Sequence, residues 1–347
     1  MIDDIILDWF CLSNTVGIGP KKFWALMKKY KTAKESLNYV KYPFPRNKAK
    51  EILKSINYKT LLATDATFPI ELKRNSSCPP MLFYQGDKSI LAKEKVAIVG
   101  ARNASIQGMK IAKTLGEKLS TDYAIVSGLA KGIDASAHLG VLSCLETKSA
   151  IAVLPFSLEN IYPKENKNIY EKIAQNGLLI SEVTPYSVPE QGMFQARNRL
   201  ISLLSKGVII IEASLKSGTM STAKLALDYG CEVMVVPGSP LDPRYAGSNL
   251  LIKNGAPLIQ NFYDVLEILG KDSSKLEHVH LETKRISYDE DDAKYEKVLA
   301  ALSNNPVSFD IISEYTQIEI PELLRIVSDL EILGKVIKHY TNEIALA

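Results

Sequence analysis

The sequence predicts an α/β protein whose central domain is a doubly wound, mainly parallel sheet. Six short β-rich runs lie between about residues 95 and 269, and helix-length amphipathic stretches separate them. The runs are mostly apolar, as expected for strands that helices cover on both faces. The 347 residues are 46% hydrophobic and 23% charged, which suffices for two to three domains with cores. We therefore predict a Rossmann-like sheet with the strands Val96–Val99, Ala124–Val126, Ala150–Leu154, Leu178–Ser181, Val208–Ile211 and Val233–Val236.

The chain before this region, to about residue 75, is predicted to be helical, because its apolar residues recur at helical spacings. Residues 1–60 contain 12 Lys and Arg against 5 Asp and Glu, which gives a net charge of +7. We expect this basic part to extend a track for an anionic partner.

One motif stands out in the basic part. Gly17 and Gly19 form a Gly-Ile-Gly turn, and Pro20 follows at the first position of a helix that continues with Lys21 and Lys22. Free backbone N–H groups at such a helix start suit a phosphate. The motif resembles a helix-hairpin-helix, which contacts DNA backbones without sequence preference, and its alternative is a plain turn in a helix bundle.

The end of the chain is predicted to be a winged-helix-like domain. The three predicted helices are Lys294–Leu302, Phe309–Tyr315 and Pro321–Leu333. A predicted hairpin of the strands Val336–His339 and Ile344–Leu346 follows them. This domain is acidic, with a net charge of −3 over residues 294–347, so we expect it to bind protein or to regulate rather than to grip DNA. The predicted organisation is a helical SAM/helix-hairpin-helix-like domain at 1–70, the Rossmann-like domain at 71–269, a polar linker at 270–292 and the winged-helix-like domain at 293–347.

The sequence also bears on the cellular location of the protein. No apolar run approaches the roughly 18 residues that span a bilayer. The first ten residues carry three Asp and no Lys or Arg, which is unlike a signal peptide. Four single cysteines form no CxxC pair, so we expect reduced thiols, no metal site and a cytoplasmic location.

The first βα turn of the central region, Gly100 to Ser105, matches neither common nucleotide motif. A dinucleotide-binding turn would have Gly where this chain has Arg102 and Ser105, and no Gly-Lys-Ser/Thr of a P-loop occurs anywhere. What remains is a helix N-terminus with a fixed positive charge, which is a candidate anion site. The alternative is a structural Arg102 that pairs with an acid.

Two further βα turns have the same character. Ser127 and Gly128 follow the second strand, with Asp134 in the next helix, and Ser217 and Gly218 begin the helix after the fifth strand. The carboxyl ends of parallel strands meet at one edge of a sheet, so these helix starts converge on one crevice. Small residues let backbone N–H groups approach closely, and three such turns predict a site for several phosphates.

Positive and aromatic side chains lie near these turns. Phe194 could stack on a base while Arg197 and Arg199 contact phosphates, and Lys164 lies on another loop after a strand. In the alternative interpretation Phe194 belongs to the core and one arginine is structural.

The sequence offers little for catalysis. His138 is near the crevice, but a lone helical histidine is more often a packing residue than a base. Asp134 and Glu212 could act as acid or base, although helix capping and an arginine partner are more ordinary roles. No Ser-His-Asp order or metal-ligand spacing is present.

Together the motifs resemble one family. Gly100-Ala-Arg-x-x-Ser105, Ser127-Gly-Leu-Ala-x-Gly-Ile-Asp134, Tyr162-Pro-x-x-Asn166, Phe194-x-x-Arg-Asn-Arg199, Ser217-Gly-Thr219, and Val236-Pro-Gly238 followed by Gly247-x-Asn249 occur in this order. This series is similar to the DNA processing protein A family (DprA, also called Smf), over about residues 65–262. The resemblance implies a Rossmann-like domain that binds single-stranded DNA and dimerises. It also implies protection of incoming DNA and delivery of the RecA recombinase onto it in natural transformation, with no cofactor and no catalytic residues.

Carried over position by position, the resemblance implies a DNA site built from Arg102, Ser105, Gly108, Ser127, Gly128, Lys164, Phe194, Arg197, Ser217 and Gly218. Arg102 and Lys164 would be the main electrostatic contacts, and Phe194 the stacking platform. The competing function is a nucleotide-binding hydrolase of the phosphoribohydrolase type. Those enzymes carry a Glu three residues after the Gly-Thr step, where this chain has Thr222. A purely structural protein would leave the convergent Gly and Ser turns unexplained.

Overall fold

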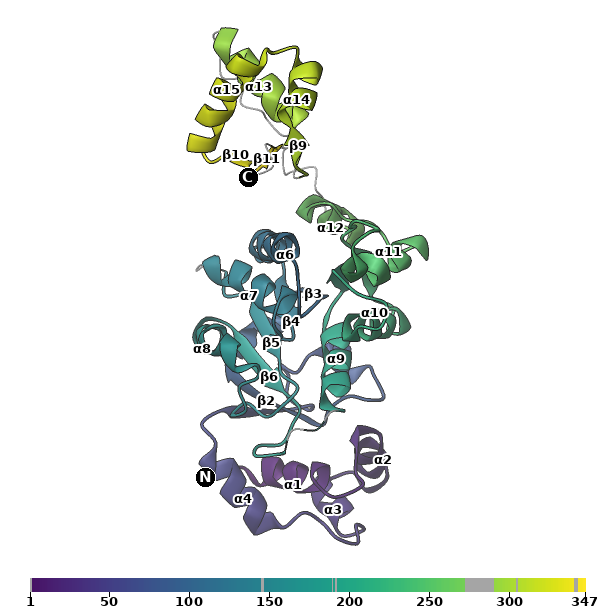
Figure 1. Cartoon of the computed structure of the whole chain (residues 1–347). Coiled ribbons are helices and arrows are strands. Elements are labelled where there is room, and N and C mark those ends of the chain that lie inside the picture. Colours follow the sequence, from purple (N-terminus) through teal and green to yellow (C-terminus); the bar gives the residue numbers. More distant parts are fainter. Residues whose placement is uncertain are drawn as a thin grey trace. The chain divides into compact units, whose positions relative to one another are not determined.

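The computed structural model describes residues 2–144, 147–188, 190, 192–271, 290–303, 305–339 and 343–347. The chain divides into two compact units, Met1–Ser273 and Ser274–Ala347. Figure 1 shows the larger unit as a sheet with helices on both faces and a group of short helices at one end. Most of the predicted linker, residues 272–289, lies outside the described residues. Within the described part no helix combines the length and the hydropathy that crossing a bilayer requires.

An eight-stranded sheet organises the larger unit. The strand order is β1-β2-β6-β5-β4-β3-β7-β8, and the six strands from β3 to β8 are parallel, which confirms the predicted doubly wound sheet. The strands are β1 (Lys59–Leu62), β2 (Met81–Gly86), β3 (Lys95–Gly100), β4 (Ala124–Ser127), β5 (Ala150–Val153), β6 (Leu178–Ser181), β7 (Gly207–Ile211) and β8 (Glu232–Val235). All six predicted strands are present.

Two strands were not predicted. β1 and β2 pair with each other in antiparallel register, and β2 also pairs antiparallel with β6. β1 lies inside the stretch that the sequence predicted to be helical, so that prediction is wrong over Lys59–Leu62. The four residues are too few to show a period of two, and pairing with β2 determines their conformation.

Helices cover the sheet on two sides. Helices α6 (Ile106–Leu119), α7 (Ile133–Ser143) and α8 (Lys167–Asn176) lie on one side, and α9 (Met193–Leu204) and α10 (Gly218–Asp228) lie on the other (Figure 1). The chain runs from β3 outward to β6 and then returns to place β7 on the other side of β3. The gap between β3 and β7 is therefore the topological switch point, where open α/β sheets bind ligands beyond the carboxyl ends of the strands.

Four helices precede the sheet, and the larger unit continues past β8 in two more. They are α1 (Asp4–Ser13), α2 (Pro20–Tyr30), α3 (Ala33–Leu37), α4 (Arg46–Ser55), α11 (Ala246–Lys253) and α12 (Phe262–Ile268). Gly19 caps α2 and Pro20 takes its first position, as the Gly-Ile-Gly-Pro motif predicted. Phe10 of α1 contacts Phe83 of β2, with ring centroids 6.3 Å apart, so the helical part and the sheet share one core.

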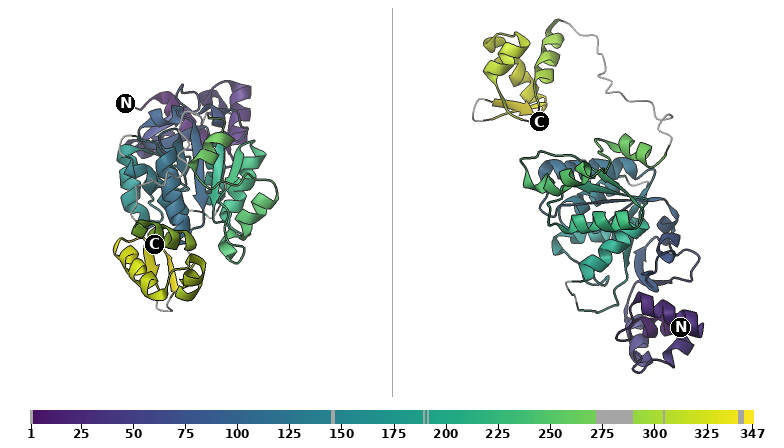
Figure 2. Two further views of the ribbon diagram at one scale, coloured as in Figure 1. Left: turned by 90° about the horizontal axis from the view of Figure 1, so that it is seen from above. Right: turned by 90° about the vertical axis from the view of Figure 1, so that its right-hand side faces the viewer.

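The described residues of the smaller unit form three helices and a three-stranded sheet, which can be followed in Figure 2. The helices α13 (Glu290–Ala301), α14 (Phe309–Thr316) and α15 (Ile320–Ile332) confirm the three predicted helices. The strands β10 (Val336–Lys338) and β11 (Glu343–Leu346) confirm the predicted hairpin, and β9 (Val307–Ser308) adds a third strand. The turn between β10 and β11 lies outside the described residues. This is a winged-helix arrangement.

Candidate nucleic-acid interface

A cleft of about 450 Å³ lies at the switch point between β3 and β7. All three predicted βα turns contribute to its walls, and α9 supplies a fourth wall. Of the ten predicted DNA-binding residues, five line the cleft: Arg102, Phe194, Arg197, Ser217 and Gly218. Half of the ten predicted residues therefore line this cleft.

Arg102 and Phe194 lie together in the lining of the cleft. The Arg102 guanidinium lies over the Phe194 ring, 4.9 Å from its centroid. Arg102 is exposed and forms no ion pair within the described part of the chain. Phe194 is half-buried, and the edges of Phe156 and Tyr162 hold its ring at centroid distances of 5.2 and 5.8 Å. A fixed aromatic ring beside an unpaired guanidinium can take a flat π-system and a phosphate together.

The N-terminus of α10 opens onto the same cleft. Ser217 is its N-cap residue, but the Ser217 side chain makes no capping bond, and its buried hydroxyl has no hydrogen-bond partner among the described residues. Gly218 is exposed, and a Cβ on it would meet nothing within 4 Å. The Met220 amide donates to the Ser217 carbonyl at 3.2 Å, whereas the Gly218 and Thr219 amides have no partner among the described residues and keep their capacity for an anion.

The N-terminus of α6 is different, because the protein fills it with its own carboxylate. Glu212, fully buried after β7, accepts a hydrogen bond from the Ser105 amide at 2.9 Å, one from the Ser105 hydroxyl, and one from the Tyr245 hydroxyl at 3.0 Å. A Cβ on Gly108 would lie 2.4 Å from a Glu212 oxygen, so only glycine fits there. We therefore interpret Ser105 as a hydrogen-bond partner of Glu212, and Gly108 as the residue that leaves room for its carboxylate, rather than as contacts for DNA.

Arg197 forms the floor of the cleft. The side chain is 6% exposed and donates to the carbonyls of Gly128 at 2.6 Å and Val153 at 3.0 Å. Burial lowers the pKa of Arg197 to about 10, although the negative charge of Asp134 acts in the opposite direction. Burial in turn raises the pKa of Asp134, which accepts the Gly128 amide at 3.1 Å. Arg197 thereby links the ends of β4 and β5.

The other predicted residues lie away from the cleft surface. Ser127 is fully buried and donates to the carbonyl of Ile98 at 2.6 Å, which links β4 to β3. Lys164 is exposed on the loop after β5 and does not line the cleft. Its neighbour Asn166 donates to the carbonyls of Leu129 at 2.9 Å and Ala130 at 3.1 Å, so this loop is anchored to the β4–α7 turn on the rim of the cleft.

The three groups that could have served in catalysis are all buried, although Asp134 also lines the cleft. Asp134 and Glu212 form the internal contacts described above. His138 is fully buried in α7, and neither ring nitrogen has a side-chain hydrogen-bond partner among the described residues. Burial lowers the pKa of His138 to about 4, against the opposing effect of the Ser127 backbone. Thr222, which stands where the hydrolases have Glu, is 3% exposed and donates to the Gly218 carbonyl at 3.3 Å.

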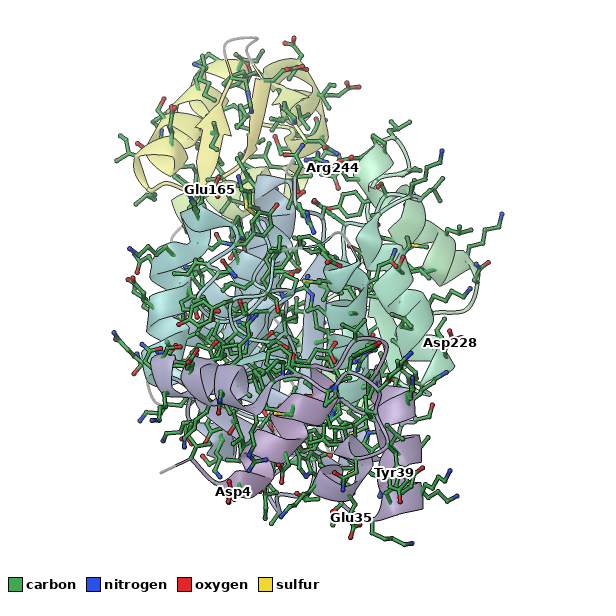
Figure 3. All side chains as sticks on the ribbon, turned by 90° about the horizontal axis from the view of Figure 1, so that it is seen from below. Asp4, Glu35, Tyr39, Glu165, Asp228 and Arg244 are labelled. Carbon is green, nitrogen blue, oxygen red and sulfur yellow. The ribbon has the colours of Figure 1, made fainter. Side chains whose placement is uncertain are left out.

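Arg244 also lines the cleft and was missed by the sequence analysis. It follows β8, and Asp242 holds its guanidinium through bonds to Nε and Nη2. Figure 3 shows Arg244 far from Asp4, Glu35 and Tyr39 of the N-terminal helical part. The rule that ligands bind beyond the carboxyl ends of parallel strands would have found it, since Arg244 is the first arginine after the sixth predicted strand. Arg199, by contrast, pairs with Glu182 in a largely buried ion pair.

Comparison with known proteins places the chain in a family. A sequence model described as "DNA recombination-mediator protein A" matches residues 59–270, and one described as "DprA winged helix domain" matches residues 282–339. The DNA processing protein DprA of Streptococcus pneumoniae is 40% identical over 202 residues, which are 58% of this chain and 71% of that protein. The Smf protein of Escherichia coli is 33% identical over 299 residues, 84% of this chain and 79% of that protein.

Solved structures agree with the sequence matches. The crystal structure of DprA from Streptococcus pneumoniae aligns with a TM-score of 0.68 and 30% identity, covering 77% of this chain and 98% of the other. A DNA processing protein A from Helicobacter pylori, whose structure was described for its single-stranded DNA binding mode, aligns with a TM-score of 0.55 and 35% identity, covering 62% and 96%. The chain belongs to the DNA recombination-mediator protein A family, the family of DprA and Smf.

Proposed function

We propose that this protein binds single-stranded DNA in the cleft between β3 and β7. The observation that carries the proposal is the combination at the switch point: an exposed Arg102, with no ion pair among the described residues, over a fixed Phe194 ring, beside the open N-terminus of α10. Phe194 would stack on a base, Arg102 would neutralise a phosphate, and the Ser217 and Gly218 backbone would hold a neighbouring phosphate. The Helicobacter pylori relative, described as binding single-stranded DNA, supports the same partner.

Membership of the family extends the proposal to the cellular role. The protein would shield incoming single strands, act as a dimer through its Rossmann-like domain, and load the RecA recombinase onto the strand during natural transformation. No bond of the DNA is broken in this role. The internal hydrogen bonds of Asp134 and Glu212 and the full burial of His138 support a binding function rather than the hydrolase alternative. Lys164, on the rim, would contact the strand only where it leaves the cleft.

The decisive experiment is a titration of a fluorescent single-stranded oligonucleotide at several salt concentrations, with Arg102→Ala compared to wild type. The matched control is Lys110→Ala, which removes one exposed charge from α6 outside the cleft. We expect Arg102→Ala to weaken binding and to reduce the salt slope by about 0.7, one phosphate on a single strand, while the control binds as wild type. Equal binding by all three proteins would refute the proposal.

Dimer formation and RecA loading are each tested by a separate experiment. Sedimentation of wild type at micromolar concentration tests the dimer. RecA filament formation on oligonucleotides coated by a single-stranded-DNA-binding protein tests loading, with Arg102→Ala as the binding-deficient control. Binding without stimulation of filament formation would confine the function to protection of the strand.

A further inference from the structure

A second basic groove lies between α2 and the segment that follows β1. It has a volume of about 740 Å³, and its lining includes Lys21, Trp24 and Lys28 of α2, together with Lys73, Asn75 and Ser76. Lys73 ends α5 (Ile70–Lys73), and Asn75 and Ser76 lie in the loop that leads to β2. None of the described residues that line the groove is acidic.

The sequence of α2 explains why its charges point into this groove. Lys21, Trp24 and Lys28 are spaced three and four residues apart, so they share one helix face. Phe23, fully buried, anchors the helix from another side. Lys22 and Lys29 are equally exposed but do not line the groove. One helix thus carries two sets of lysines that differ in orientation and not in charge.

The positive charge of the groove is not neutralised within the described part of the chain. Lys21, Lys28 and Lys73 form no ion pair with any carboxylate described there. The Lys73 ammonium donates to the backbone carbonyl of Asp65 at 2.9 Å, which fixes its position without cancelling its charge. Three uncompensated cations that converge on a concave surface favour a polyanion.

Trp24 gives the groove a fixed aromatic wall. Its indole N–H donates to the Cys78 carbonyl at 2.8 Å, and the rings of Phe23 and Trp9 contact it edge-on at 5.3 and 5.8 Å. The ring is half-buried, so part of it remains open to the groove. An aromatic ring between lysines is the pattern by which proteins hold single strands, because every base offers a π-face while the lysines track the backbone.

We propose that this groove is a second binding site for single-stranded nucleic acid, in which Lys21, Lys28 and Lys73 contact phosphates and Trp24 stacks on a base. The proposal rests on the function proposed above and adds a separate site to it. The groove and the cleft share no lining residue, and Figure 3 shows Arg244 of the cleft far from Asp4, Glu35 and Tyr39 of the N-terminal helical part. A strand long enough to occupy both sites would bind more tightly than one that fills the cleft alone.

The test compares three variants of the full chain: Lys21→Ala/Lys28→Ala/Lys73→Ala, the control Lys22→Ala/Lys29→Ala, and Arg102→Ala. Each is titrated with a long and a short oligothymidylate at several salt concentrations. Removal of three phosphate contacts should reduce the salt slope for the long strand by about 2, since each contributes about 0.7, and should weaken binding on the order of 100-fold at 0.1 M salt. The control should lose far less, and the short strand should depend mainly on Arg102.

Fluorescence gives a local readout. The chain has two tryptophans, and Trp9 is 4% exposed, so a Trp9→Phe variant isolates the emission of Trp24 in the groove. The long strand should quench Trp24, and this quenching should persist in Arg102→Ala. Unchanged affinity and slope in the triple variant, or an equal loss in the Lys22/Lys29 control, would overturn the second site while leaving the cleft untouched. Quenching by polyglutamate but not by oligothymidylate would also overturn it and would assign the groove to an acidic protein.

Discussion

Replacing Glu212 with glutamine tests whether a buried carboxylate takes the place of a ligand at the N-terminus of α6. The Ser105 amide, the Ser105 hydroxyl and the Tyr245 hydroxyl all donate to this carboxylate. A hydrogen bond to a charged group contributes about 1.5–3 kcal/mol and a neutral one about 0.5–1.5 kcal/mol. Glutamine keeps the shape and one acceptor but loses the charge, and the charge at a helix N-terminus contributes about 0.3–1 kcal/mol more. We expect Glu212→Gln to lower the free energy of unfolding by about 2–3 kcal/mol.

Urea unfolding followed by tryptophan fluorescence measures this change, since Trp9 and Trp24 both lie in the larger unit. The matched control is Glu232→Gln, which neutralises an exposed carboxylate at the start of β8. A Glu212→Ala variant adds a second readout, because it leaves the Ser105 amide without its acceptor and opens room for an anion. Inorganic phosphate should stabilise the alanine variant and not wild type. If Glu212→Gln unfolds at the same urea concentration as the control, the carboxylate is not what holds this turn.

Three further outcomes follow from the contacts of the cleft. Phe194→Ala should weaken single-strand binding by about 1–3 kcal/mol at unchanged salt slope, because stacking is lost while the phosphate contacts remain; a change of slope in the oligonucleotide titration would contradict this. Gly128→Ala should destabilise the protein by about 2–4 kcal/mol in urea, since the new Cβ would lie 1.6 Å from the Arg197 guanidinium and displace a buried cation; a wild-type midpoint would refute it. Stability should fall as the pH drops from about 6.5 to about 4, because His138 binds a proton more readily in the unfolded chain than in the fold, where burial lowers its pKa to about 4. The loss is at most about 3 kcal/mol, and His138→Leu should remove it; parallel pH profiles would show that other groups cause the acid sensitivity.

The sequence predicted the parallel strands because each is a short apolar run between helix-length segments, and burial on both faces produces that pattern. It did not predict β1, whose register depends on pairing with β2 rather than on its own four residues. It placed Arg102, Phe194 and Ser217 at one crevice, because the carboxyl ends of parallel strands meet.

The residue types could not show which helix N-terminus is already occupied by a side chain of the protein itself. Ser105 and Ser217 both precede a helix after a strand, and both appeared equally suited to a phosphate. Glu212 fills the first of these helix starts from a position 107 residues away, and only the folded chain brings the two together. The same holds for Arg197, whose carbonyl partners at the ends of β4 and β5 are 69 and 44 residues away in the sequence.

Glu212 binds at the N-terminus of α6, whereas the N-terminus of α10 is open, and this difference makes the cleft asymmetric. With α6 closed by Glu212, the open anion-binding end belongs to α10, and the stacking ring of Phe194 lies on a different wall. Each nucleotide has a phosphate on its 5′ side and another on its 3′ side, and the two lie in different directions from the base. A fixed phosphate position on α10 and a fixed stacking position on Phe194 would therefore favour one strand polarity over the other in the binding mode proposed above.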